Sequence, residues 1–375
     1  MFKSIVPLSG AVVLAAVIAV PASMAAQAQA PASGKSAVAK GPAAAKKFVA
    51  KRTPWGDPDI SGNFTTKDEA NTPMERPEEF AGRKIEDITP AELEKANEAR
   101  RRRALAAAPY PGGGSRARGV AIAVPIHWFD SLDTENARPW FIVDPPDGRI
   151  PPQTDDAKQR TAARVAARRE RGTADSYTDR SAGDRCIAWS IGAGRILPTL
   201  YGNSVQILQA KDYVAIRYEM VHETRIIPIA GRGASRPHNS STLQSYYGDA
   251  TARWEGDTLV VDTVNYNAKV GIGFIGGAGA ATTTPTLHTI EKFTRTAPNK
   301  VEFSATFEDA KTWARPWTFS IPFTEDDTQA IFEYACHEGN YGLRNILSAG
   351  RSDDKKGIKS SDSVDQQNDL RDFEE

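Results

Sequence analysis

The most regular pattern in the chain is an alternation of apolar and polar residues between about residues 203 and 335. In the stretch DYVAIRYEMVHE, the charged residues Arg217, Glu219 and Glu223 share one face. The opposite face carries Val214, Ile216, Tyr218, Met220 and His222. A period of two is typical of a β-strand with one buried face. We therefore predict a strand here whose apolar face, including His222, points inward.

Further strands follow at short spacing. TARWEGDTLVVDT predicts a hairpin that turns at residues 255–257, and LHTIEKFTRT, KVEFSATFED and RPWTFSIPF alternate in the same way. About eight or nine short strands without a helical pattern between them indicate an antiparallel meander. The predicted fold class is mainly β, either a calycin- or lipocalin-like barrel or a strongly curved sheet. A barrel of about eight strands can enclose one small ligand.

Two helices are predicted before this region. Thr89 and Glu92 form a capping box, with Pro90 at the first helical position, and this motif predicts the beginning of a helix. The predicted helix ends before Pro109. Thr154 can cap a second, arginine-rich helix that ends at Gly172. We predict a looped and partly helical region over residues 53–185, packed on a barrel domain over residues 186–350.

The ends of the chain have their own composition. Residues 1–30 combine a lysine, a short apolar stretch and small residues, which is typical of a cleaved signal peptide. Residues 31–52 are rich in alanine and lysine and predict a disordered tether, and residues 351–375 predict a disordered polar tail. We expect a periplasmic or secreted protein without stable membrane insertion after signal cleavage.

The charge balance and the cysteine content bear on which partners and which cross-links the protein has. The 47 basic and 47 acidic residues balance, so nothing favours nucleic acid or an anionic membrane as a partner. Cys186 and Cys336 are the only cysteines, and export permits a disulfide between them. Two buried thiols, or one thiolate that binds a metal ion, are the competing interpretations.

Polar residues at two places suggest chemistry. His222 continues an apolar strand face, where an imidazole must be hydrogen-bonded, ligated or functional. Near the C-terminal end, EYACHEGNYGLRNIL brings together polar candidates that serve either catalysis or closure of the barrel. These candidates are His337, Glu338, Asn340, Tyr341 and Arg344.

Several other residues are candidates for ligand contact. His238 lies in a segment that is predicted to be a loop, and loops often carry ligand contacts. His288 begins a predicted strand and is expected to be structural. Aromatic residues of the β region, if they line a cavity, suit a flat apolar or aromatic ligand. The segment GIGFIGGAG has GxGxxG spacing but opens no helix, so we interpret it as a loop and not as a nucleotide site.

A metal site needs three or four converging ligands. His222, His238, His337 and Cys336 could form such a set, but no two of them have the short spacing of a metal-binding motif. We therefore expect neither a metal ion nor another cofactor.

Seven motifs together resemble a widespread group of exported bacterial proteins. They are TPWGDPDISGNF, ERPEEFAG, VDPPDGRIPP, RWEGDTLVVDT, LHTIEKFTR, ARPWTFSIP and EYACHEGNYGLRNIL. In setting, this group resembles the accessory enzymes of bacteria that degrade plant-derived aromatics. The resemblance implies lyase chemistry on lignin-type dimers, including loss of formaldehyde from a hydroxymethyl side chain.

The favoured hypothesis is an exported lyase that cleaves a small hydrophobic, plant-derived aromatic substrate by metal-free acid–base chemistry, either elimination or retro-aldol cleavage. His222 is the expected base, with His337 and Glu338 as its partner pair. Arg225 is expected to stabilise negative charge, and Tyr341 to deliver a proton. The expected substrate-binding residues are Tyr218, His238, Tyr246, Trp254 and Asn340. A periplasmic ligand-binding protein and a metal-dependent hydrolase are the alternatives.

Overall fold

The computed structural model describes residues 48–107, 134–171, 174–190, 195–199, 201–230, 236–272, 283–328 and 330–358. The predicted signal peptide, most of the predicted tether and the end of the predicted tail lie outside these ranges, as does most of the glycine-rich segment. Within these ranges, no helix is both long and apolar enough to cross a bilayer.

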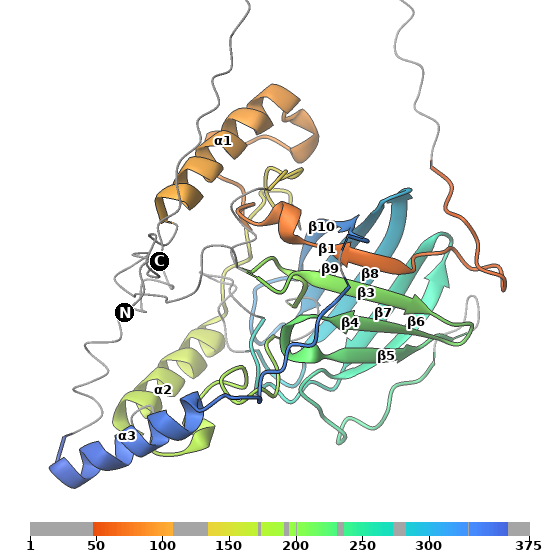
Figure 1. Cartoon of the computed structure of the whole chain (residues 1–375). Helices are drawn as coiled ribbons and strands as arrows, with labels where there is room; N and C mark the ends of the chain where they lie inside the picture. Colours follow the sequence, from red (N-terminus) through yellow and green to blue (C-terminus); the bar gives the residue numbers. More distant parts are fainter. Residues whose placement is uncertain are drawn as a thin grey trace, which may run out of the picture. The chain divides into compact units, whose positions relative to one another are not determined.

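Ten strands of the described chain form one antiparallel sheet (Figure 1). The strands are β1 (Gly62–Thr65), β2 (Ile142–Asp144), β3 (Ser204–Gln209), β4 (Tyr213–Tyr218), β5 (Thr224–Pro228), β6 (Asp249–Glu255), β7 (Thr258–Val264), β8 (His288–Ala297), β9 (Lys300–Glu308) and β10 (Trp317–Glu325). Their order is β5-β4-β3-β1-β10-β9-β8-β7-β6, and β2 pairs with β10. The end strands β5 and β6 approach each other through a parallel bridge between Ile229 and Ala252. The sheet is therefore nearly closed into a barrel, and the predicted fold class is confirmed.

The alternation in the sequence explains which side chains fill the interior. On β9, Val301, Phe303, Ala305 and Phe307 are fully buried, and the residues between them are partly exposed. On β10, Trp317, Phe319, Ile321 and Phe323 are also buried, and so are Ser320 and Pro322 between them. The rings of Phe303 and Phe323 stack 5.4 Å apart, and those of Phe307 and Trp317 stack 4.6 Å apart. Burying each such side chain contributes about 1.5–3 kcal/mol, so this aromatic layer is a main source of stability.

The N-terminal region contributes strands to the sheet as well as packing on it. β1 lies between β3 and β10, with Phe64 opposite Val205 on one side and Glu325 on the other. β2 pairs with β10 through Ile142 and Asp144. The barrel is therefore assembled from segments on both sides of residue 186.

Both predicted helices are present, with the predicted caps. Helix α1 (Pro90–Ala107) begins at the capping box, in which the Thr89 hydroxyl donates to the Glu92 carboxylate at 2.7 Å and accepts from the Glu92 N–H at 3.4 Å. Helix α2 (Asp155–Arg171) begins with the Ala157 N–H donating to Thr154 Oγ1 at 3.1 Å. Side-chain acceptors at these positions satisfy N–H groups that lack a partner within the helix.

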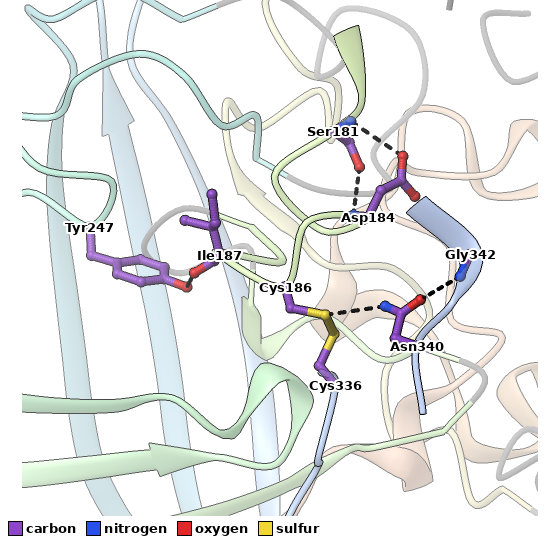
Figure 2. Close-up of a disulfide and its surroundings, with 8 residues drawn as sticks. All are labelled: Ser181, Asp184, Cys186, Ile187, Tyr247, Cys336, Asn340 and Gly342. Atoms are coloured by element: carbon purple, nitrogen blue, oxygen red, sulfur yellow. Dashed lines mark hydrogen bonds between the residues drawn. A yellow bond between two sulfur atoms is a disulfide. The ribbon is translucent and has the colours of Figure 1, made fainter. Parts of the chain in front are cut away.

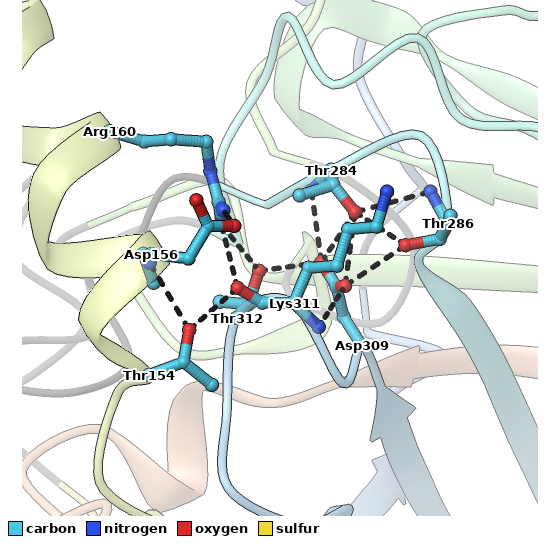
Figure 3. Close-up of polar contacts among 9 residues, drawn as sticks. Thr154, Asp156, Arg160, Thr284, Thr286, Asp309, Lys311 and Thr312 are labelled. Atoms are coloured by element: carbon cyan, nitrogen blue, oxygen red, sulfur yellow. Dashed lines mark hydrogen bonds and ion pairs between the residues drawn. The ribbon is translucent and has the colours of Figure 1, made fainter.

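A buried carboxylate helps to tie α2 to the barrel. Asp309 is 4% exposed and accepts hydrogen bonds from the Thr284 N–H at 2.9 Å and the Thr312 hydroxyl at 2.6 Å (Figure 3). The carbonyl of Lys311 accepts from the Thr154 hydroxyl at 2.7 Å and from Arg160 at 3.0 Å. The turn after β9 thus holds the start of α2.

Two features differ from the sequence predictions. Helix α3 (Gly342–Lys356) continues into the predicted disordered tail and ends at Gly357, which adopts a left-handed conformation with φ 69°. Such a conformation at a helix end suits glycine. The described chain therefore remains ordered beyond residue 351.

The second difference concerns His222. Strand β4 ends at Tyr218, and Val221 and His222 both have positive φ values, 59° and 57°, in the turn before β5. His222 is exposed. The prediction that it points inward is wrong because the chain reverses direction before reaching it.

Candidate functional site

A pocket of ≈ 370 Å³ lies where the end strands of the sheet meet. Its walls come from residues 223–228, residues 248–251, and the connecting residues 236, 237, 239 and 247. The Ala230 N–H donates to the carbonyl of Ala252 at 2.7 Å, next to the bridge between the two strands. We call this the seam pocket. Its volume falls within the range of about 300–1,000 Å³ that small-molecule sites occupy.

The side chain of Arg195 contacts three other side chains beside this pocket. Its guanidinium carbon lies 4.0 Å from the ring centroid of Tyr247 and 4.6 Å from that of Tyr218. Its Nη1 forms an ion pair with the carboxylate of Glu223, and the side chains of Arg195 and Glu223 are only 2% and 13% exposed. Cation–π contacts and ion pairs are stronger when water is excluded. A carboxylate, a guanidinium and a phenol therefore meet beside the seam pocket.

A second buried pair lies beside the first. Arg225 donates to both carboxylate oxygens of Glu291, at 2.9 and 2.8 Å, and these side chains are 5% and 0% exposed. Arg225 also donates to the hydroxyls of Tyr218 at 3.4 Å and Thr263 at 3.3 Å. Burial disfavours the charge on Arg225, but the carboxylate of Glu291 outweighs this effect and holds the pKa of Arg225 well above its usual value. Arg225 therefore remains charged while it lines the pocket.

The two tyrosines of this cluster remain protonated at neutral pH. Burial raises the pKa of Tyr218, although Arg225 and Arg195 oppose the effect. Burial and the neighbouring Glu223 carboxylate raise the pKa of Tyr247. A neutral phenol can donate a proton or a hydrogen bond, so both side chains are potential donors.

Two histidines and three carboxylates form a chain across β6, β7, β8 and β9. His238 Nε2 lies 2.9 Å from one oxygen of Asp262, and His288 Nε2 lies 3.1 Å from the other. His238 Nδ1 lies 3.4 Å from Asp249, and His288 Nδ1 lies 2.9 Å from Glu308. The hydrogen bond from His288 lowers the pKa of Asp262, and Asp262 in turn raises the pKa of His288. These contacts between side chains connect the segment that carries His238 to the sheet.

The disulfide lies near the same region. Cys186 and Cys336 form a bond that spans 150 residues, so the predicted pairing is confirmed. Figure 2 shows that the amide of Asn340 donates to the sulfur of Cys186, at 3.5 Å. The hydroxyl of Tyr247 donates to the carbonyl of Ile187 at 3.5 Å. The loop from Ser181 to Ile187, which the disulfide links to Cys336 and which we call the disulfide-linked loop, therefore contacts a residue of the seam pocket.

The structure groups only some of the predicted site residues. Tyr218 and Arg225 lie together beside the seam pocket. His238 contacts carboxylates, and its neighbours Pro237 and Asn239 line the pocket. Trp254 is 5% exposed and belongs to the core.

The remaining predicted residues lie elsewhere. His222 is exposed in the β4–β5 turn, as described above. His337, Glu338, Asn340 and Tyr341 are exposed in the segment between Cys336 and α3. Tyr246 lines a separate pocket. The functional roles assigned to these residues from the sequence stay predictions.

Four residues of the cluster were not predicted as site residues: Arg195, Glu223, Tyr247 and Glu291. Only Glu291 has a clear signal in the sequence, because it alternates with Thr289 and Phe293 on the buried face of its strand. A carboxylate on a buried face requires a cationic or hydrogen-bonding partner. Arg225, which the structure places on β5, fills this role.

Within the described residues, no group of three or more histidine, cysteine, aspartate or glutamate side chains is arranged to hold a metal ion. The sequence matches no protein-family model, and no curated protein is significantly similar to it.

Proposed function

We propose that this protein is an exported enzyme that cleaves a small, hydroxylated aromatic compound at the seam pocket by metal-free acid–base chemistry. The reaction class is a carbon–carbon or carbon–oxygen lyase. The observation that carries the proposal is the meeting of the Glu223 carboxylate, the Arg195 guanidinium and the Tyr247 phenol beside one pocket. An elimination or a retro-aldol cleavage needs a base, an acid and a positive charge in this arrangement.

Each group has a role in the proposed retro-aldol reaction. Glu223 accepts the proton of a substrate hydroxyl, whose oxygen forms a carbonyl as the adjacent carbon–carbon bond breaks. The electron pair of that bond passes to a carbonyl group on the departing fragment, and the resulting enolate takes a proton from Tyr247 on carbon. Arg195 and Arg225 stabilise the negative charge that develops. A proton then returns from Glu223 to Tyr247 through water, so the step is balanced and needs no oxidant.

The lining of the seam pocket supports a substrate with both apolar and polar parts. Ile227, Pro228 and Pro237 offer apolar contact, and Thr224 and Asn239 offer hydrogen bonds. A hydroxylated aromatic ring matches this mixture. If the substrate bears a hydroxymethyl group, the carbonyl product is formaldehyde. The signal-peptide pattern of residues 1–30 supports the proposed location outside the cytoplasm.

The test is mass spectrometry of hydroxylated aromatic dimers after incubation with the purified mature protein, with and without a chelator. Glu223→Gln and Tyr247→Phe are expected to lower kcat by about 10²–10⁴-fold, the usual contribution of a positioned acid or base. His222→Ala and His337→Ala are the matched controls, and we expect both to retain turnover. Full turnover in both Glu223→Gln and Tyr247→Phe would refute the proposed roles. Loss of product with the chelator would instead favour the metal-dependent hydrolase.

A non-catalytic ligand-binding protein is the second candidate. The pairing of Arg195 with Glu223 and of Arg225 with Glu291 favours it, because paired charges can hold a polar ligand without reacting with it. The same incubation separates the two functions. A binding protein returns its ligand unchanged, and Glu223→Gln then alters Kd with no product formed by either protein.

A further inference from the structure

A second pocket, of ≈ 510 Å³, has a strongly basic lining. It lies between the C-terminal part of α2, residues 178–185 and residues 268–269. Five of its lining residues carry positive charge, and one, Asp179, carries negative charge. The positive residues are Arg164, Arg171, Arg180, Arg185 and Lys269. We call this the basic pocket.

Internal ion pairs satisfy only part of this charge. Arg171 pairs with Asp179 at 2.8 Å, and Arg180 pairs with Asp184 at 3.1 Å. Arg185 donates through Nε to the carbonyl of Ser181 at 3.3 Å. In the described part of the chain, neither Arg185 nor Lys269 has a carboxylate within ion-pair distance. Positive charges gathered around one pocket repel one another, and a bound anion would relieve that repulsion.

The wall that carries Arg185 is held in place by local contacts. The Asp184 N–H donates to Ser181 Oγ at 3.0 Å, and the Ser181 N–H donates to the Asp184 carboxylate at 3.2 Å (Figure 2). The next residue after Arg185 is Cys186, which is fixed by the disulfide. A binding group that is already ordered loses little conformational entropy when a ligand arrives. This order is a second observation that favours a binding site.

The side chains of the basic pocket also fit a particular chemistry. A guanidinium donates two parallel hydrogen bonds to a carboxylate or a phosphate, and a lysine adds a compact positive charge. Thr178, Ser181 and Tyr246 add polar or aromatic side chains, and the rest of the lining consists of Ala167, Ala182 and Ala268. The volume lies within the range of small-molecule sites.

We propose that the basic pocket binds a small organic anion with two or more oxyanion groups, either carboxylate or phosphate. The proposal does not depend on the reaction at the seam pocket, because the two pockets share no lining residue. It assigns a ligand class to the arginine-rich end of α2, which the proposed function leaves without a role.

Isothermal titration calorimetry of the mature protein with citrate and with inorganic pyrophosphate tests the proposal. We expect saturable one-site binding of at least one probe at low ionic strength, weakened by added salt. Binding of citrate alone assigns carboxylates, and binding of pyrophosphate alone assigns phosphates. Arg185→Gln and Lys269→Gln are each expected to weaken binding by about tenfold, the loss that follows from one charge-assisted hydrogen bond.

Lys158→Gln and Arg253→Gln are the matched controls. Each removes one positive charge outside the basic pocket, and Lys158 lies on the same helix, α2. We expect both to change Kd less than about twofold, since exposed charges at a distance are screened. Circular dichroism establishes that the variants are folded. The proposal is overturned if neither probe binds saturably, or if the controls weaken binding as much as the pocket variants do.

Discussion

Tyr246 and Tyr247 are adjacent in the chain, yet their side chains line two different pockets. Tyr247 lines the seam pocket and stacks on Arg195, and Tyr246 lines the basic pocket. The Tyr247 hydroxyl also reaches the carbonyl of Ile187, one residue beyond Cys186. Two candidate binding sites thus share one short backbone segment and one disulfide-linked loop.

The single and double substitutions of the buried pair Arg225 and Glu291 are expected to have non-additive effects on stability. Removing one partner leaves the other charge buried and alone, which costs about 3–5 kcal/mol. We therefore expect Glu291→Gln and Arg225→Met each to lower the free energy of unfolding by about that amount. The double variant Arg225→Met/Glu291→Met is expected to recover much of the loss, because no isolated charge remains. Urea denaturation measures all three, and additive losses in the double variant would contradict this account.

The alternation of apolar and polar residues was sufficient to predict most of the fold. β9 follows it over its full length, because one face of this strand is buried and the other is not, whereas Ser320 and Pro322 of β10 are buried as well. The same pattern was misleading at His222. A turn with two consecutive left-handed residues is normally marked by glycine or asparagine, and here it is formed by Val221 and His222. No local signal ended the strand, so the alternation ran on past the turn.

The candidate site was less predictable than the fold for a topological reason. Glu223 and Tyr247 lie in separate segments that meet only because β5 and β6 are the end strands of the sheet. Strand order is not encoded in a two-residue period. Tyr218 was identified because it continues the apolar face of a single strand, and Arg225 because it lies close to His222 in the sequence. Their partners could be identified only from the three-dimensional arrangement, because Glu291 lies on a distant strand, β8, and Arg195 lies outside the strands.

Glu69 is expected to make stability depend on pH. It is 1% exposed and accepts hydrogen bonds from the Ala137 N–H and the Thr72 hydroxyl, at 2.8 and 2.9 Å. Burial raises its pKa from 4.5 to about 7, although these hydrogen bonds oppose the shift. The folded state therefore binds a proton more tightly than the unfolded state. The resulting stability is fully present below pH 4.5 and is lost as the pH rises through about 7.

The measurement is the free energy of unfolding between pH 4.5 and pH 7.5 for the native protein and Glu69→Gln. The native protein is expected to lose up to about 3 kcal/mol from this group across the interval. Glu69→Gln cannot ionise, so its profile is expected to be flatter by that amount. Parallel profiles for the two proteins would show that Glu69 does not titrate in this range.

Asp309 is expected to be important for the attachment of α2. Its carboxylate accepts from the Thr284 N–H and from the hydroxyls of Thr284 and Thr312. Asp309→Asn replaces one acceptor oxygen by a donor, so at least one buried donor loses its partner at a cost of about 1–3 kcal/mol. Urea denaturation measures the loss. Asp212→Asn, at an exposed aspartate, is the control and is expected to change stability by less than about 0.5 kcal/mol. Equal effects of the two substitutions would contradict the role of Asp309.

The disulfide is expected to affect both stability and the two pockets. Closing a loop of 150 residues restricts the unfolded chain, and disulfides of this kind contribute about 2–5 kcal/mol. Reduction, or the double variant Cys186→Ser/Cys336→Ser, is therefore expected to lower the free energy of unfolding by that amount. It also frees the loop that carries Arg185 and contacts Tyr247. Binding of the anion probe is expected to weaken in the same samples.

The comparison of native protein and double variant, each with and without reductant, separates these effects. Reductant acts on the native protein alone if the disulfide is its target, so the double variant provides the control. An unchanged unfolding midpoint in the reduced native protein would show that the folded contacts, such as Asn340 with Cys186, hold this region without the bond. A lower midpoint with unchanged anion affinity would show that the disulfide stabilises the fold but does not order the basic pocket. A fall in both is expected, because the loop from Ser181 to Ile187 is held between Cys336 and Tyr247.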